Sequence, residues 1–149
     1  MTQYWIGVAA GNHVAIGVKD GFAMFAHGRH EAARRVQPGD WVAYYSPREG
    51  MNEGAELRAF TAIGQALPGD AAERQMLPGV TGWYRRMQWL DATPADIYPL
   101  LDKLSFVKDR QHWGVYFRKS LFKVDGGDFA LIADAMGVGR EFGSQFKSQ

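Results

Sequence analysis

The sequence predicts a mixed α/β (α+β) fold of about five or six short strands with flanking helices. Short runs rich in aromatic and β-branched residues recur along the chain, and glycine, proline or serine closes them, as is typical of strands. Between these runs lie segments with helix caps and apolar residues at helical spacing. The chain of 149 residues is long enough to bury a core of its own, so we expect a single domain over residues 1–149.

Composition and charge narrow the classes of function. The formal net charge of +1 excludes binding of polyanions by bulk charge, so any basic surface must be local. The absence of cysteine excludes a disulfide scaffold, a thiolate zinc site and a thiol nucleophile. No window approaches the ~20 apolar residues of a membrane span and no signal-peptide pattern opens the sequence, so we expect a cytoplasmic protein that binds no membrane. Aromatic residues make up 13% of the chain, and we expect some of them to serve stacking rather than the core.

In the first third of the chain, strands and helices are predicted to alternate. The expected elements are a strand over Tyr4–Ala10, a helix over His13–Lys19, a strand over Phe22–Ala26 and a helix over Glu31–Val36. Asn12 is a typical cap for the first helix, and Gly21 is a typical stop. The loop His27–His30 carries two imidazoles, a glycine and a guanidinium.

The stretch Val36–Pro47 is predicted to organise the core. Pro38 presets one backbone angle and Gly39 can take the positive φ of a type II turn, while Asp40 can bond backbone amides there. The following run Trp41–Tyr45 is apolar throughout, which predicts a strand buried on both faces, as in a small barrel. We expect this strand to end at the next Ser-Pro pair and to bring two tyrosines and a serine to one rim.

The remaining elements follow from the same patterns. In order, we expect an exposed loop over Arg48–Glu56, a strand over Arg58–Gly64 antiparallel to the central strand, a connection over Leu67–Gly82, a strand over Trp83–Leu90, a helix from Thr93, a strand over Leu121–Val124, a helix over Gly127–Met136 and a frayed tail from Gly139. Thr93 and Pro94 are a typical cap and first helical residue, and apolar residues from Ile97 to Leu104 supply the buried face. On a strand, Arg85 and Arg86 must face opposite sides.

A series of motifs in this order resembles the small bacterial EVE-domain proteins. The motifs are Tyr4-Trp5, His27-Gly28, Pro38-Gly39-Asp40-Trp41, Tyr44-Tyr45-Ser46-Pro47, Phe60-Thr61-Ala62-Ile63-Gly64, Arg85-Arg86, Leu104-Ser105-Phe106, Trp113-Gly114 and Phe117-Arg118. The EVE family belongs to the PUA-like superfamily and is related to the YTH readers of methylated adenine. The resemblance covers nearly the whole chain and implies a PUA-like pseudo-barrel with a pocket at one rim.

In relatives such a pocket holds a modified base flipped out of DNA or RNA. The resemblance therefore implies a non-enzymatic reader of a methylated or hydroxymethylated base, with DNA or RNA as partner, no cofactor and no obligate protein partner. His112 stands where the family often has an asparagine, and Trp83 and Tyr84 stand where it often has proline and phenylalanine. These departures leave the identity of the ligand open.

Base recognition needs an aromatic floor and hydrogen bonds to the base edge, and we expect both at this rim. The expected pocket residues are Trp5, His27, Gly28, Tyr45, Ser46, Trp83, Arg85, Trp113 and Arg118, and the expected phosphate contacts are Arg29, Arg86 and Lys108. The alternative for aromatic residues is a place in the core, which we expect for Trp41, Tyr44 and Trp89.

Two other classes of function are weighed against the reader. A small PUA-like hydrolase acting on a modified nucleoside would use Ser46, His27 and Arg118. A plain interaction module would hold a cellular anion in the pocket. Metal binding is not expected, because His27 and His30 lack a third ligand at useful spacing.

Overall fold

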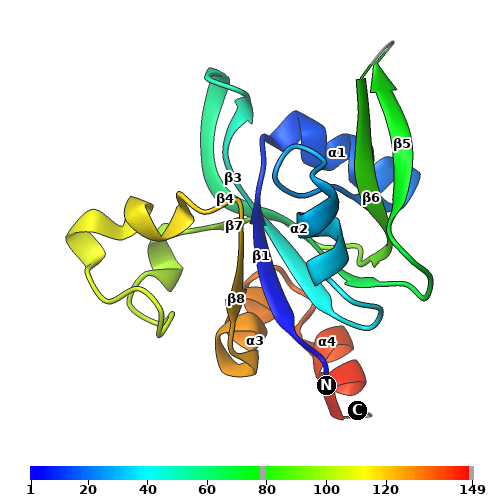
Figure 1. The fold of residues 1–149 in the computed structure, drawn as a ribbon. Coiled ribbons are helices and arrows are strands. Elements are labelled where there is room, and N and C mark those ends of the chain that lie inside the picture. Colours follow the sequence, from blue (N-terminus) through cyan, green and yellow to red (C-terminus); the bar gives the residue numbers. More distant parts are fainter. Residues whose placement is uncertain (78–79, 148–149) are drawn as a thin grey trace.

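The chain folds into one curled mixed sheet with helices packed on both sides (Figure 1). The computed structural model describes residues 1–77 and 80–147. Over these residues the sheet runs in the order β2-β6-β4-β3-β1-β8, with β5 beside β6 and β7 beside β4. The strands are β1 (Tyr4–Val8), β2 (Phe22–Ala23), β3 (Trp41–Gly50), β4 (Glu53–Ala66), β5 (Ala72–Leu77), β6 (Val80–Trp89), β7 (Ala95–Asp96) and β8 (Leu121–Val124). The predicted mixed fold with flanking helices is confirmed.

The helices of the described residues are short. They are α1 (Gly11–Asp20), α2 (His30–Arg35), α3 (Gly126–Ala135) and α4 (Gly139–Lys147), with 3₁₀ helices η1 (Tyr98–Leu100) and η2 (Arg110–Phe117). Gly21 ends α1 with a left-handed φ of 76°, as predicted. Asn12 is not its cap, because α1 begins at Gly11, two residues before the predicted start, and Ala10 occupies the cap position without a side-chain bond. The predicted helix over Gly127–Met136 is confirmed as α3, which the side chain of Asp125 caps by accepting from the Asp128 amide.

The turn before β3 joins this strand to β1. Gly39 has the predicted positive φ, at 88°. Asp40 is 1% exposed, and its carboxylate accepts from the backbone N–H groups of Gln3 and Gln37 and from the Trp5 indole, at 2.9, 2.9 and 3.0 Å. Three donors satisfy this buried carboxylate, so Asp40 locks the start of β3 against β1, which pairs with β3 in parallel.

Strands β1 and β3 are buried on both faces, as predicted for β3. Side chains alternate along a strand, so Ile6 and Tyr45 face the cluster packed by α3 and α4, whereas Trp5 and Tyr44 face the cluster packed by α1 and α2. The antiparallel pairing of β4 with β3 is also confirmed. The sheet therefore carries a core on each side.

Three predictions between Ser46 and Gly82 are wrong. β3 does not end at the Ser-Pro pair, because Pro47 lies at a register shift, where its missing N–H does not break the ladder. The expected loop over Arg48–Glu56 is the tip of the β3–β4 hairpin, turned at Asn52 with a φ of 59°. The expected connection over Leu67–Gly82 contains β5, which pairs with β6, while residues 78 and 79 lie outside the described residues.

Two predictions in the second half are also wrong. No α-helix starts at Thr93, because Ala95 and Asp96 pair with β4 and a 3₁₀ turn follows. The apolar residues expected on the buried face, Ile97, Leu100, Leu101 and Leu104, are nevertheless buried. The tail after Gly139 is helical as far as Lys147, because Phe142 packs against Trp41 and Phe129, and residues 148 and 149 lie outside the described residues.

Candidate functional site

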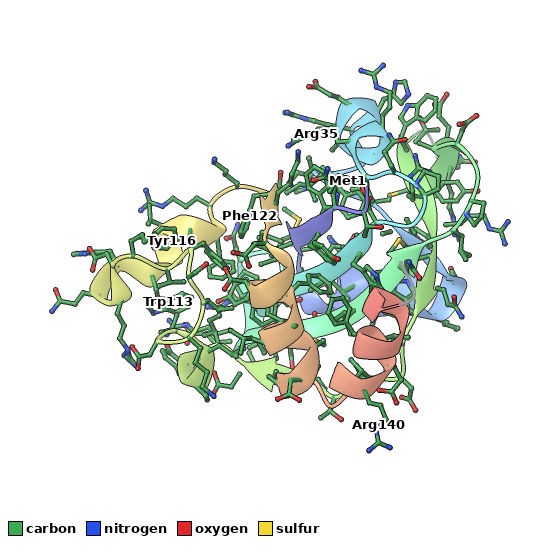
Figure 2. The ribbon with its side chains drawn as sticks, turned by 90° about the horizontal axis from the view of Figure 1, so that it is seen from below. Met1, Arg35, Trp113, Tyr116, Phe122 and Arg140 are labelled. Carbon is green, nitrogen blue, oxygen red and sulfur yellow. The ribbon has the colours of Figure 1, made fainter. Side chains whose placement is uncertain are left out.

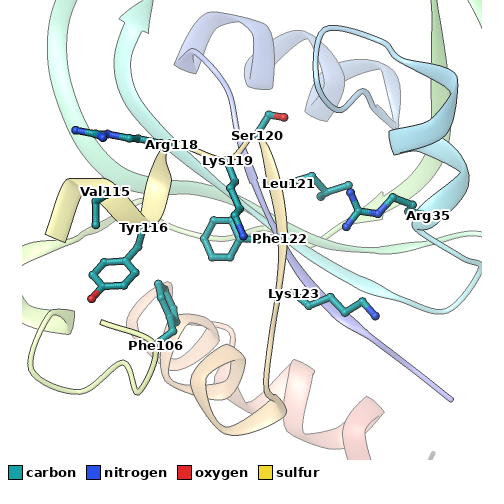
Figure 3. Close-up of a pocket in the computed structure, with 10 residues that line it drawn as sticks. All are labelled: Arg35, Phe106, Val115, Tyr116, Arg118, Lys119, Ser120, Leu121, Phe122 and Lys123. Carbon is teal, nitrogen blue, oxygen red and sulfur yellow. The ribbon is translucent and has the colours of Figure 1, made fainter. Parts of the chain in front are cut away.

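A pocket of about 1020 Å³ lies beside β8, the last strand in the sheet order (Figure 3). Its walls come from the end of α2, the segment after η1, the end of η2 and β8 itself. The lining residues are Arg35, Phe106, Val115, Tyr116, Arg118, Lys119, Ser120, Leu121, Phe122 and Lys123. We call this site the β8 pocket.

The charge of the β8 pocket is all of one sign. Its lining includes the cations Arg35, Arg118, Lys119 and Lys123 and no carboxylate. Among the residues that the structure describes, none of these four cations forms an ion pair. Because the whole chain carries a net charge of only +1, the pocket is a local basic surface.

Three half-buried aromatic rings form the apolar part of the pocket. The Phe106 ring meets those of Tyr116 and Phe122 edge to face, with centroids 6.2 and 5.6 Å apart. The Tyr116 hydroxyl accepts from the backbone amides of Lys108 and Asp109, both at 3.0 Å, which fixes the ring against the preceding loop. The rings are therefore held in place while part of their surface stays accessible.

Trp5 contacts two of the pocket cations and does not line the pocket. The side chain is 1% exposed and donates its indole N–H to Asp40. The Arg35 guanidinium lies 5.2 Å from the ring centroid, and the Lys123 ammonium lies 5.5 Å from it. Cation–π attraction therefore orients two of the four pocket cations. The core covers the Trp5 ring in this structure, and the expectation that Trp5 contacts a base stays a prediction.

The rim predicted at Tyr45 and Ser46 is closed in the structure. Tyr45 is 2% exposed, with Phe117 stacked on its ring at 4.2 Å and Trp113 at its edge, and burial raises the pKa of its hydroxyl. Ser46 is fully buried, and its hydroxyl lies 2.8 Å from that of Thr61. Trp113 is half-buried against these rings and Tyr98. A base cannot stack on Tyr45 while Phe117 occupies that face.

A second group of predicted residues gathers where the loop before α2 meets β6. His27 is exposed with a φ of 59°, and the Gly28 amide already donates to the Phe25 carbonyl at 3.0 Å. The Gly28 carbonyl accepts from the Trp83 amide at 2.8 Å. The ring of Trp83 stacks on His30 with centroids 3.8 Å apart. These residues lie outside the lining of the β8 pocket.

Arg85 belongs to this second group as a structural residue. It is 4% exposed and donates to the carbonyls of Ala33 and Gly69, at 3.4 and 2.5 Å, and burial lowers the pKa of its guanidinium. Arg86 is exposed, so the prediction that the two arginines face opposite sides is confirmed. Because Nε and Nη1 donate to backbone carbonyls and the side chain is buried, Arg85 joins α2 to β6 and to the segment at Gly69.

Of the predicted pocket residues, only Arg118 lines the β8 pocket. The expected phosphate contacts Arg29, Arg86 and Lys108 are exposed but lie outside the lining. The missed residues are Arg35, Phe106, Val115, Tyr116, Lys119, Ser120, Leu121, Phe122 and Lys123. Alternating basic and aromatic residues from Phe106 onward were a visible signal, but the free edge of β8 follows only from the strand order.

The described residues contain neither a cluster of metal-binding side chains nor a membrane-spanning helix. No group of three or more His, Asp or Glu side chains within residues 1–77 and 80–147 is placed to hold a metal ion. Over the same residues, no helix is long and apolar enough to cross a membrane.

Together, the curled mixed sheet and the helices on both sides define a small α+β fold with a basic pocket at one edge of the sheet. The chain belongs to the EVE domain family, whose pattern matches residues 3–135, and this confirms the resemblance seen in the sequence. It is 44% identical to the UPF0310 protein msl3206 of Mesorhizobium japonicum over 140 residues, covering 93% of this chain and 94% of that protein. It is 38% identical to the UPF0310 protein YdcG of Bacillus subtilis over 137 residues, covering 92% of this chain and 94% of that protein.

Two solved structures have a similar fold at low sequence identity. A Rhodopseudomonas palustris protein solved by NMR superposes with a TM-score of 0.57 at 16% identity, covering 92% of this chain and 94% of that one. An Agrobacterium tumefaciens protein solved by crystallography gives a TM-score of 0.56 at 12% identity, covering 93% of this chain and 95% of that one. At these identities the likeness concerns the fold alone.

Proposed function

We propose that the protein binds DNA or RNA in the β8 pocket and that the pocket holds a modified base without catalysing a reaction. The observation that carries the proposal is the lining itself, which combines four cations and three accessible rings with no carboxylate. Lysine and arginine contact phosphates, and stacking on an aromatic ring contributes about 1–3 kcal/mol per base. Arg118, Lys119 and Lys123 would hold phosphates while the rings hold a base.

A modified base suits the apolar part of this lining. Phe106, Val115 and Phe122 offer carbon surface rather than hydrogen-bonding groups to a ligand. A methyl group that is buried against such a surface adds about 0.8 kcal/mol, which is about a fourfold gain in affinity. The membership in the EVE family supports the same class of ligand.

The arrangement of the candidate catalytic residues favours binding over hydrolysis. A serine nucleophile needs an exposed hydroxyl within hydrogen-bond reach of a base. The Ser46 hydroxyl is buried and its neighbour is Thr61, whereas His27 is exposed in the loop before α2. A reader function requires neither residue to react.

Fluorescence anisotropy with labelled single strands tests this proposal. The strands carry one methylated or hydroxymethylated cytosine, one methylated adenine or no modification, each as DNA and as RNA, over a range of salt concentrations. We expect the preferred modified strand to bind about fourfold tighter than its unmodified match. Equal binding of all strands with a steep salt dependence would show a basic patch without base recognition. Turnover of an alkylated or acylated nucleoside would contradict the non-enzymatic assignment.

A further inference from the structure

Helix α2 joins the β8 pocket to a second place where a base can stack. Arg35, at the end of α2, lines the pocket. His30, at the start of α2, is exposed and stacks on Trp83 with centroids 3.8 Å apart and planes 28° from parallel. Trp83 covers one face of the imidazole, and His30 is an exposed residue that a ligand can reach. A planar aromatic group can therefore extend this stack.

The outer surface of α2 between these two places is basic. Ala32 and Ala33 face the core, whereas His30, Arg34 and Arg35 are exposed. The preceding Arg29 is also exposed, and Glu31 is the one acid of the helix. Among the described residues, neither Arg29 nor Arg34 forms an ion pair, so their charges are available to an anion.

We infer that a bound single strand continues from the β8 pocket along the exposed surface of α2 and stacks a second base on His30. This inference rests on the proposed function and extends it to a strand of several nucleotides. The phosphate between the two bases would meet Arg34, and a phosphate beyond the second base would meet Arg29. The partner is a single strand because stacking on His30 requires an unpaired base with a free face.

The length of α2 sets a lower limit for the size of the ligand. His30 and Arg35 are five residues apart, which corresponds to about 7.5 Å along a helix axis. A strand rises by about 3.4 Å per nucleotide when its bases are stacked. A mononucleotide has one base, which cannot occupy the β8 pocket and stack on His30 at once, so affinity should increase when the strand is long enough to supply a second base.

The experiment compares a modified mononucleotide with single strands of two to eight nucleotides that carry the same modified base at either end. Each ligand is titrated by anisotropy or calorimetry against the native chain and against His30→Glu and Arg34→Gln. Arg140→Gln is the matched control, because Figure 2 shows Arg140 pointing away from the molecule on α4, on the side opposite Arg35. Thermal unfolding confirms that each variant is folded.

We expect the eight-nucleotide strand to bind the native chain at least about tenfold tighter than the mononucleotide. His30→Glu should remove most of that gain and leave mononucleotide affinity within about twofold. Arg34→Gln should lower the salt slope for the long strand by about 0.7 and leave that of the mononucleotide unchanged. Arg140→Gln should change the affinity of neither ligand.

Four results would overturn the inference. If the long strand binds no tighter than the mononucleotide, or if His30→Glu has no effect on it, the strand does not cross α2 while the proposed function stands. If polyglutamate of matched charge competes as well as the strand, α2 attracts charge alone. If neither the mononucleotide nor the long strand binds, the proposed function fails and this inference fails with it.

Discussion

Two neighbouring aromatic clusters differ in what covers their rings. In the first, Tyr45 is stacked by Phe117 and met at its edge by Phe60 and Trp113, so the rings satisfy one another in the core. In the second, the half-buried rings of the β8 pocket stand beside four cations. Aromatic content alone therefore does not locate a binding surface. The proposed site rests instead on accessible ring faces that lie beside unpaired charges of one sign.

The largest expected effect is the loss of stability when a ring of the first cluster is removed. Tyr45→Ala should lower the free energy of unfolding by about 3–5 kcal/mol, because it leaves a cavity under Phe117. Urea denaturation measures this loss, and Met51→Ala, at an exposed position, is the control with a change within about 0.5 kcal/mol. A stable Tyr45→Ala protein that no longer binds a modified base would place the site at Tyr45.

Charge reversal in the β8 pocket should weaken binding and leave stability nearly unchanged. The double variant Arg118→Glu/Lys119→Glu replaces attraction to phosphate by repulsion at two exposed positions, and we expect affinity for a single strand to fall about a hundredfold at low salt. The free energy of unfolding should change by less than about 1 kcal/mol. Lys19→Glu/Arg140→Glu makes the same change of charge outside the pocket and should bind within about threefold of the native chain. An equal loss in both double variants would mean that net charge alone drives binding.

Removing one ring of the β8 pocket should have the opposite pattern to Tyr45→Ala, with a larger effect on binding than on stability. Phe122→Ala should weaken binding by about 1–3 kcal/mol, because a stacking surface is lost. Its cost in stability should be smaller, at about 1 kcal/mol, because the side chain is half-buried on an edge strand. Anisotropy and urea denaturation on the same preparation give both values. Unchanged affinity would exclude Phe122 from the ligand contact.

The smallest expected effect concerns the cations that Trp5 orients. Lys123→Gln removes one phosphate contact, so the slope of log affinity against log salt should become shallower by about 0.7–0.9. Affinity at high salt should hardly change. A slope equal to that of the native chain would show that Lys123 points its charge at Trp5 and not at the ligand.

The fold was readable from the sequence where the determinants are local. The turn at Gly39 and the apolar run of β3 needed only neighbouring residues, and Asp40 was identified as a residue able to bond backbone amides. The helix predicted from Thr93 failed because pairing of Ala95 and Asp96 with β4, a distant contact, overrode local capping signals.

The candidate site was less predictable than the fold, because its position depends on which strand forms the edge of the sheet. Burial on both faces of β3 already argued against an open rim at Tyr45, and the burial pattern was the stronger signal. Lys119 to Lys123 line a pocket because β8 pairs with β1 on one edge, and that pairing joins residues more than a hundred positions apart. No local pattern specifies such a contact.

The most direct test of the account maps the ligand onto the structure. Titration of the labelled protein with a modified nucleoside monophosphate, followed by NMR chemical shifts, reports which residues sense the bound base. We predict that the largest shifts occur at Phe106, Tyr116 and residues 118–123, with Tyr45 and Ser46 unperturbed. Largest shifts at Tyr45, Ser46 or His27, with none along β8, would contradict it.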